Sequence, residues 1–296
     1  MKLGLDSYSY HLAFGCHADF TPKRKMTLPQ FIDRVADLGL DGFQIDPMHL
    51  TRKDRTTLRK IAQHAQARGL FLEYGAMGLE PSYLFAELEV CAELGSPVLR
   101  TFANFNRYAK TTHLDREIKR AIRSLCRVTR RAEQLGVRIA VENHGDFSAE
   151  ELVEVVRAVD SPWVGICLDL GNSMATLEDP LQAAAKMAPY AVTSHFKDHC
   201  VQMTFSGYSV NGCALGDGMI DLASAWRLLK TKTRLDRIIL EIPCPAAAKE
   251  KQTLEKENEM VSRSVAYARR LFRIEFAGRG AELISSDDRS ARTRMP

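Results

Sequence analysis

Apolar residues along the chain follow two different spacings. Short apolar runs, rich in β-branched or aromatic residues, recur between longer stretches in which apolar residues are three and four positions apart. The short runs predict buried β-strands, whereas the three- and four-residue spacing predicts amphipathic helices. The predicted strands are Lys2–Asp6, Gly42–Ile45, Leu70–Tyr74, Pro97–Thr101, Val137–Glu142, Val164–Asp169, Val192–His195 and Arg237–Glu241.

Residues that commonly cap helices bound the intervening stretches. Thr27 and Ser148 stand at the start of two of them, and Gly69, Gly95 and Gly136 stand directly after the end of three. Hydroxyl side chains satisfy the first free N–H groups of a helix, and glycine tolerates the left-handed conformation that often ends one. The predicted helices are Leu28–Leu38, Thr56–Arg68, Ser82–Leu94, Leu114–Leu135, Ala149–Val159, Leu181–Met187, Leu222–Lys230 and Leu254–Phe272.

Strands and helices therefore alternate along most of the chain, eight of each. This order favours an α/β fold of the (β/α)8 type, a TIM barrel, as a single domain over residues 1–275. A doubly wound open sheet is the structural alternative, but no glycine-rich phosphate loop follows the first strand. The segment 276–296 is polar and lacks periodicity, so it is predicted to be a disordered tail.

Composition narrows the class of protein. Of the 296 residues, 45% are hydrophobic and 26% are charged, which is typical of a globular domain. The net charge of +4 is too small for this length to indicate a nucleic-acid partner, and no apolar stretch is long enough to span a membrane. The start of the chain lacks the apolar run of a signal peptide, and the seven cysteines form no CxxC pair. We therefore expect a cytoplasmic protein.

The carboxyl ends of the last four predicted strands carry residues that can bind a metal ion. Glu142 lies in VENHGD, Asp169 in LDLGN, His195 in SHFKD and Glu241 in LEIP. In a barrel the carboxyl ends of all strands meet at one face, where active sites are built. Each residue alone is better explained as a helix cap, an ion-pair partner or a packed histidine, but the coincidence of all four predicts one metal site. This mixture of oxygen and nitrogen ligands suits Mn²⁺, Mg²⁺ or Co²⁺, with Zn²⁺ also possible.

The motifs VENH, LDLGN, SHFKD and LEIP resemble those of the xylose isomerase-like TIM barrels, the sugar phosphate isomerase/epimerase superfamily, over about residues 1–275. The resemblance implies that Glu142, Asp169, His195 and Glu241 bind one divalent ion. It also implies a small sugar or sugar acid as substrate, from which an enediolate forms while the ion holds a carbonyl and an adjacent hydroxyl. As in the epimerases, Glu142 and Glu241 would face each other across the substrate and move protons.

Three further residues near the predicted mouth have two interpretations each. His144 is either a general base or a loop histidine in solvent. Lys197 binds an anionic substrate or protonates a carbanion, or else it forms a salt bridge with Asp198 or Glu142. Arg100, at the end of the fourth strand, grips a substrate carboxylate or pairs with a carboxylate of the protein, because a buried charge needs a partner.

The residues after the first and sixth strands add two substrate-binding candidates. His11 follows the first strand and is expected to line the pocket, with Tyr8 and Tyr10 beside it. Asn172 stands where the ketose epimerases usually carry a histidine that holds a ketose hydroxyl, and Val201 stands where they usually carry an arginine. These departures count against a plain ketose epimerase, and the cations Arg100, Lys197 and Lys110 make an acidic sugar derivative a candidate.

The resemblance leaves the reaction open, because its members include ketose 3-epimerases, hydroxypyruvate isomerases, two kinds of dehydratase, C-glycoside deglycosidase subunits and 3-oxo-isoapionate decarboxylases. The first hypothesis is an isomerase or epimerase of carbohydrate metabolism, and the second is a lyase that decarboxylates a 3-oxo sugar acid. Dehydration and C-glycoside cleavage are the next hypotheses after these two. A DNA-repair endonuclease of this fold would need further histidines for three zinc ions, and a non-catalytic sugar-binding protein would not need all four ligands. Barrels of this kind commonly form dimers or tetramers, so a homo-oligomer is one possibility.

Overall fold

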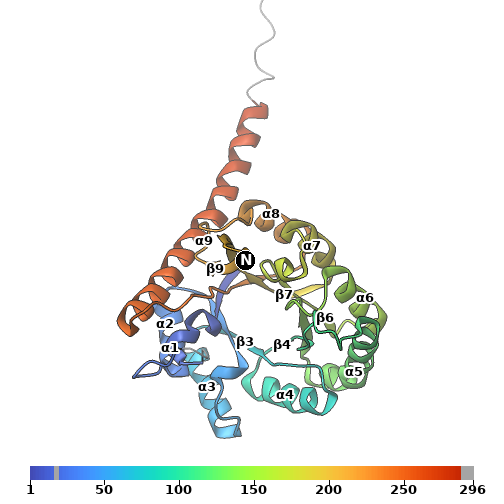
Figure 1. The fold of residues 1–296 in the computed structure, drawn as a ribbon. Helices are drawn as coiled ribbons and strands as arrows, with labels where there is room; N and C mark the ends of the chain where they lie inside the picture. The colour runs from blue at the N-terminus through green and yellow to red at the C-terminus, as the bar shows by residue number, and fades with distance from the viewer. Residues whose placement is uncertain (17–19, 288–296) are drawn as a thin grey trace, which may run out of the picture.

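The computed structural model describes residues 1–16 and 20–287 of the chain. Within this part, eight parallel strands close into a barrel in the order β1, β10, β7, β6, β5, β4, β3 and β2, with helices around it (Figure 1). This confirms the predicted (β/α)8 barrel, and each strand bound agrees with the prediction to within one residue. The strands are β1 (Lys2–Asp6), β2 (Gly42–Ile45), β3 (Phe71–Gly75), β4 (Val98–Thr101), β5 (Arg138–Glu142), β6 (Val164–Asp169), β7 (Ala191–Phe196) and β10 (Arg237–Leu240).

The helices begin and end at the predicted kinds of residue. At the start of the helix Ala149–Val159, Ser148 Oγ accepts a hydrogen bond from Glu151 N, and Ser148 N donates to Glu151 Oε2 at 2.7 Å. Gly95 and Gly136 each directly follow a helix, with φ of 70° and 66°, the left-handed region that glycine tolerates. The helices are α1 (His11–Phe14), α2 (Leu28–Asp37), α3 (Arg55–Ala67), α4 (Pro81–Leu94), α5 (Leu114–Leu135), α6 (Ala149–Val159), α7 (Pro180–Met187), α8 (Leu222–Lys232) and α9 (Glu250–Asp287).

The last helix is longer than the sequence predicted. It continues to Asp287, so residues 276–287 are helical where a disordered tail was expected. Residues 250–287 contain no proline, so no residue in this stretch forces the helix to end. The rest of the expected tail, residues 288–296, lies outside the described part of the chain. Among the described residues, no helix is both long and apolar enough to cross a membrane.

The connection between β7 and α8 forms a two-stranded antiparallel hairpin, which the sequence analysis did not predict. It consists of β8 (Asp198–Thr204) and β9 (Gly207–Cys213). Met203 lies opposite Tyr208 across the hairpin, and both side chains are exposed. An alternation of apolar and polar residues could have indicated these two strands. They were not predicted because they are more polar than the buried strands of the barrel.

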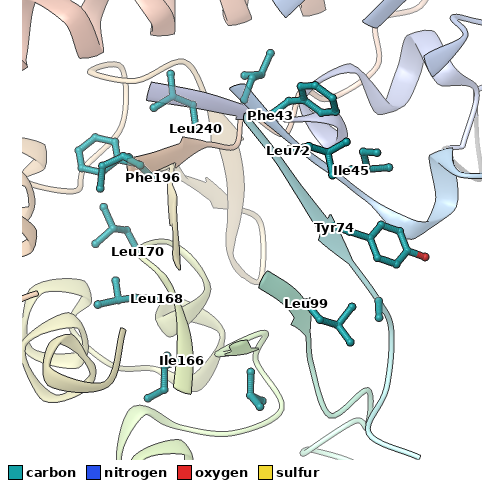
Figure 2. Packing of buried hydrophobic residues seen from close by; sticks show 14 of the residues in the cluster. Phe43, Ile45, Leu72, Tyr74, Leu99, Ile166, Leu168, Leu170, Phe196 and Leu240 are labelled. Atoms are coloured by element: carbon teal, nitrogen blue, oxygen red, sulfur yellow. The ribbon is translucent and has the colours of Figure 1, made fainter. Parts of the chain in front are cut away.

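The side chains of the barrel strands alternate between the surrounding helices and the barrel interior. Those that point outward pack with the helices into the main hydrophobic core. Figure 2 shows part of this core, including Phe43, Leu72, Leu99, Ile166 and Leu240. This packing leaves the inward positions of the strands available for other chemistry.

The barrel interior changes from apolar to polar along the strands. Ala140 and Cys167 belong to a small, separate apolar cluster inside the barrel and are completely buried. The next inward position lies two residues further along each strand, where β5 carries Glu142 and β6 carries Asp169. Polar side chains therefore lie at the carboxyl-terminal mouth, directly above an apolar floor.

The ring of Phe71 occupies the interior beside β1 and β2. A Cβ atom at Gly4 or Gly42 would collide with this ring, so both positions require glycine. The guanidinium of Arg237 lies over the same ring, 4.8 Å from its centroid, and its Nε lies 3.9 Å from Glu73 Oε1. This side of the barrel is therefore filled by packed and paired side chains.

Candidate metal centre and active site

Four neighbouring strands bring the predicted ligands together. Glu142 and Asp169 end β5 and β6, His195 lies near the end of β7, and Glu241 directly follows β10. All four side chains are buried, and one ligand atom from each lies within 4.8 Å of the others. The sequence prediction that these residues meet at one face of the barrel therefore agrees with the observed geometry.

The ligand atoms face one another, and a positive charge lies beside them on Lys197, which pairs with Asp169 and Glu241. His195 Nδ1 lies 2.8 Å from Glu241 Oε2, 3.4 Å from Asp169 Oδ2 and 3.5 Å from Glu142 Oε1. Nδ1 and one oxygen of each carboxylate are buried without a hydrogen bond. Buried carboxylates that face one another are costly unless a positive charge lies between them. A divalent cation with oxygen and nitrogen ligands fits this arrangement.

The charges around the cluster favour ionised carboxylates. Burial alone would raise the pKa of Glu142, but Arg100 and His195 hold it down at about 2. Burial also acts to raise the pKa of Glu241, and Lys197 and His195 outweigh it, so that pKa lies well below its usual value. Anionic carboxylates are the form that binds a metal ion.

The orientation of Asp169 is determined by the backbone around it. Its Oδ1 accepts hydrogen bonds from Gly171 N and Asn172 N, both at 2.8 Å. The side chain of Asn143 bonds both the N–H and the C=O of Asp169, and so ties the ends of β5 and β6 together. Only Oδ2 is left to face the cluster. Sequence analysis missed Asn143, although it lies within the VENH motif.

A cavity of about 340 Å³ opens above the cluster. It contains most of the residues that the sequence nominated, together with several that it did not. Among the unpredicted ones, Asp46 follows β2 directly, so the strand-end criterion would have found it had it been applied to the first strands as well. The lining residues are Tyr8, Asp46, Met48, Met77, Arg100, Phe102, Glu142, His144, Asn172, Lys197, His199, Glu241 and Pro243.

Lys197 lies within the ligand cluster. Its Nζ is 2.8 Å from Asp169 Oδ2 and 2.7 Å from Glu241 Oε2, rather than next to Asp198 or Glu142 as the salt-bridge interpretation expected. Burial would lower the pKa of Lys197, but Asp169 and Glu241 raise it above its usual value. The charged ammonium form of Lys197 is therefore favoured in the cavity.

Arg100 is held by carboxylates of the protein. Its Nη2 lies 3.1 Å from Asp46 Oδ2, and its Nε lies 3.3 Å from Glu142 Oε2. A weaker pairing at 3.8 Å joins it to Asp6. Of the two interpretations of Arg100, pairing within the protein is the one present in the structure, although the side chain also lines the cavity.

The remaining candidates take different places. Asn172 lines the cavity and donates a hydrogen bond to Glu142 Oε1 at 2.8 Å. His144 is exposed at the cavity and stacks on Phe102 with ring centroids 4.0 Å apart. His11, in contrast, does not line the cavity; its ring stacks on Tyr8, which does. The reason is the tight turn Ser7–Tyr10 after β1, which presents Tyr8 to the cavity.

Comparison with known proteins agrees with this architecture. The sequence profile of the family described as "Xylose isomerase-like TIM barrel" matches residues 32–270. The chain belongs to this family. It is 28% identical over 270 residues to the 3-oxo-isoapionate decarboxylase of Pectobacterium atrosepticum, a match that covers 90% of this chain and 94% of the relative. The family predicted from the four motifs is therefore confirmed.

Solved structures share the fold at low sequence identity. D-psicose 3-epimerase from Clostridium cellulolyticum H10, solved with D-tagatose, superposes with a TM-score of 0.71 at 17% identity, covering 93% of this chain and 99% of that one. The IOLI protein with a bound zinc atom gives a TM-score of 0.64 at 17% identity, covering 90% and 99%. At these identities the likeness establishes the barrel alone.

Proposed function

We propose that this protein is a metal-dependent enzyme of carbohydrate metabolism that decarboxylates a small 3-oxo sugar acid through an enediolate. Two findings support this reaction over the isomerisation that ranked first from sequence. The similarity to a decarboxylase extends over nearly the whole relative. The cavity also contains two buried cations, Arg100 and Lys197, whereas a neutral ketose needs none.

The observation that carries the proposal is the position of Lys197. Its ammonium contacts Asp169 and Glu241, two of the four metal-ligand candidates, inside the cavity. A divalent ion held by the cluster would act as a Lewis acid toward a carbonyl and an adjacent hydroxyl. An ammonium beside those ligands is placed to bind a substrate carboxylate through charge-assisted hydrogen bonds.

The residues of the cavity can supply the remaining steps. In the proposed reaction the bond between the carboxylate and its neighbouring carbon breaks, the electron pair moves toward the 3-oxo group, and CO₂ leaves. The enediolate is then protonated at the carbon that lost CO₂. Glu142, Glu241 and His144 line the cavity and are the candidate proton carriers.

Epimerisation is a second candidate, favoured by the arrangement of the two glutamates. Glu142 ends β5 and Glu241 directly follows β10, so they flank Asp169 and His195 at the two ends of the four-strand series. Two carboxylates on either side of a substrate can remove a proton from one face and return one to the other. The same cluster would then serve a neutral ketose.

A reaction in D₂O separates the two candidates. Decarboxylation of a 3-oxo sugar acid should release CO₂ and place one deuteron, in equal amount, at the carbon that lost it. Lys197→Met should raise KM for the acid by roughly ten- to a hundred-fold, the value of about 1.5–3 kcal/mol for a charge-assisted hydrogen bond. Deuterium exchange into a neutral ketose without gas, and with KM unaffected by Lys197→Met, would replace the lyase by an epimerase.

A further inference from the structure

A buried glutamine lies on the far side of His195 from the metal cluster. Gln44, on β2, is completely buried, and its Oε1 lies 2.9 Å from His195 Nε2. A carboxylate oxygen, Asp6 Oδ2, also lies near Nε2, but its distance of 3.6 Å is too long for a hydrogen bond. Among the described residues, the second nitrogen of this imidazole therefore depends on Gln44.

The neighbours of Gln44 determine which way its amide points. The guanidinium of Arg100 can only donate, and its Nε lies 3.2 Å from one end of the amide, so that end must be the oxygen. The other end lies 3.0 Å from Glu73 Oε2, where the nitrogen donates to a carboxyl oxygen. The orientation of the amide thus follows from donor and acceptor chemistry at both of its ends.

The orientation of the Gln44 amide determines which ring nitrogen of His195 carries a proton. The oxygen of Gln44 can only accept, so Nε2 must carry a proton. In the neutral imidazole Nδ1 then bears the lone pair, and Nδ1 is the atom that faces Glu142, Asp169 and Glu241. If the amide of Gln44 turned over, Nε2 would have to accept and Nδ1 would hold the proton, which blocks metal binding.

We propose that Gln44 and Glu73 are positioning residues, which hold His195 in the one tautomer and ring orientation that can bind the metal ion. Glu73 acts through Gln44, and the two come from β2 and β3, on the opposite side of the barrel from β7. Hydrogen-bond partners of metal-binding histidines commonly act in this way. The inference rests on the metal site of the proposed function, but not on which reaction the site performs.

Thr193 provides a matched control for this arrangement. Its Oγ1 donates to the same oxygen, Glu73 Oε2, at 2.8 Å, and the residue is completely buried. It lies on β7 two residues before His195, and its hydroxyl bonds Glu73 but neither Gln44 nor the imidazole. Thr193→Val keeps the shape of the side chain and removes one buried hydrogen bond of the same kind.

Metal affinity is the appropriate test, measured with Co²⁺ by competition against a chelator and by the visible absorption of the bound ion. Gln44→Met should weaken Co²⁺ binding by roughly ten- to a hundred-fold and change the Co²⁺ spectrum. Thr193→Val should leave both unchanged, although it removes a buried hydrogen bond. If Gln44→Met does not fold, Glu73→Gln takes its place: it removes the carboxylate that holds the amide nitrogen of Gln44 while Arg100 still bonds the oxygen, so affinity should fall by roughly tenfold, the lower end of the range.

The outcomes separate this inference from the proposed function. Wild-type protein that binds no divalent ion would overturn both. Wild-type protein that binds Co²⁺, with Gln44→Met and Thr193→Val both binding equally well, would overturn the positioning role alone. Equal losses of affinity in the two variants would also overturn it, because a general loosening of the barrel explains them.

Discussion

The two halves of the barrel interior carry similar polar side chains in different states. In the half formed by β5, β6, β7 and β10, here called the ligand half, Glu142, Asp169, His195 and Glu241 each bury an atom without a hydrogen bond. In the half formed by β1 to β4, the scaffold half, polar side chains mostly pair with one another, as Arg100 does with Asp46 and Gln44. One oxygen each of Asp6 and Glu73 is the exception.

This difference distinguishes a ligand-binding site from the structural framework around it. Burial and residue type alone do not make that distinction. The three buried carboxylates carry more negative charge than Lys197 offsets, and atoms buried without a hydrogen bond cost free energy, so this cluster indicates a ligand that supplies the missing charge. A satisfied cluster of equal depth indicates a framework. We therefore expect substitutions of the four candidate ligands to remove metal and activity, and substitutions in the scaffold half other than at Gln44 and Glu73 to act first on stability.

The largest effect should come from deleting a ligand. Asp169→Ala or His195→Ala should reduce the metal content from roughly one divalent ion per chain to almost none, and activity should disappear with it. Elemental analysis of the purified variants measures this. Asp179→Ala, which removes only the N-cap of α7, is the control and should retain the ion. Full activity after exhaustive chelation of the wild-type protein would contradict a metal-dependent site.

The next effect concerns the two glutamates of the ligand half. Glu142→Gln and Glu241→Gln should each lower kcat by about a hundred- to ten-thousand-fold, because each carboxylate is proposed both to bind the metal and to move protons. Circular dichroism should show an unchanged fold. Glu87→Gln is the control, since Glu87 is equally buried but bonds Tyr74 in the helix layer and should leave kcat unaltered. Near-normal turnover of Glu241→Gln would show that its role is misassigned.

The scaffold half should respond through its stability. Arg100→Met breaks a buried ionic cluster and leaves Asp46 and Glu142 without their cation, so unfolding free energy should fall by about 3–5 kcal/mol. Urea denaturation of the metal-free protein measures this loss. Arg131→Met, which breaks the exposed pair with Glu89, should change stability little. Equal losses in the two variants would mean that the buried cluster does not support the barrel.

The smallest effect should come from the exposed hairpin, which lies outside both halves. Phe205, between β8 and β9, is fully exposed, so Phe205→Ser removes no buried contact. The melting temperature should change by less than about 2 °C, and metal content should stay the same. Differential scanning calorimetry measures the melting temperature. A larger fall would indicate that the hairpin packs against something in solution, such as another copy of the chain.

Much of the fold could be predicted because its signals are local. Apolar spacing and caps such as Ser148 and Gly136 depend on residues close together in sequence, and the barrel order follows from their alternation. The meeting of the four candidate ligands was also predictable, since each stands at the end of a strand and all such ends meet in a barrel. The hairpin β8–β9 was missed because its strands are polar and largely exposed.

The sequence by itself thus determined the barrel, the family and the four residues that the barrel brings together as candidate ligands. Only the tertiary structure decided which polar residues are partners. Lys197 pairs with Asp169 and Glu241 rather than with Asp198, and Gln44 meets His195 across the barrel although 151 positions separate them. The physical reason is that hydrogen bonds and ion pairs depend on distances of about 3 Å between side chains from different strands. No local spacing in the chain encodes such distances; they arise when the barrel closes.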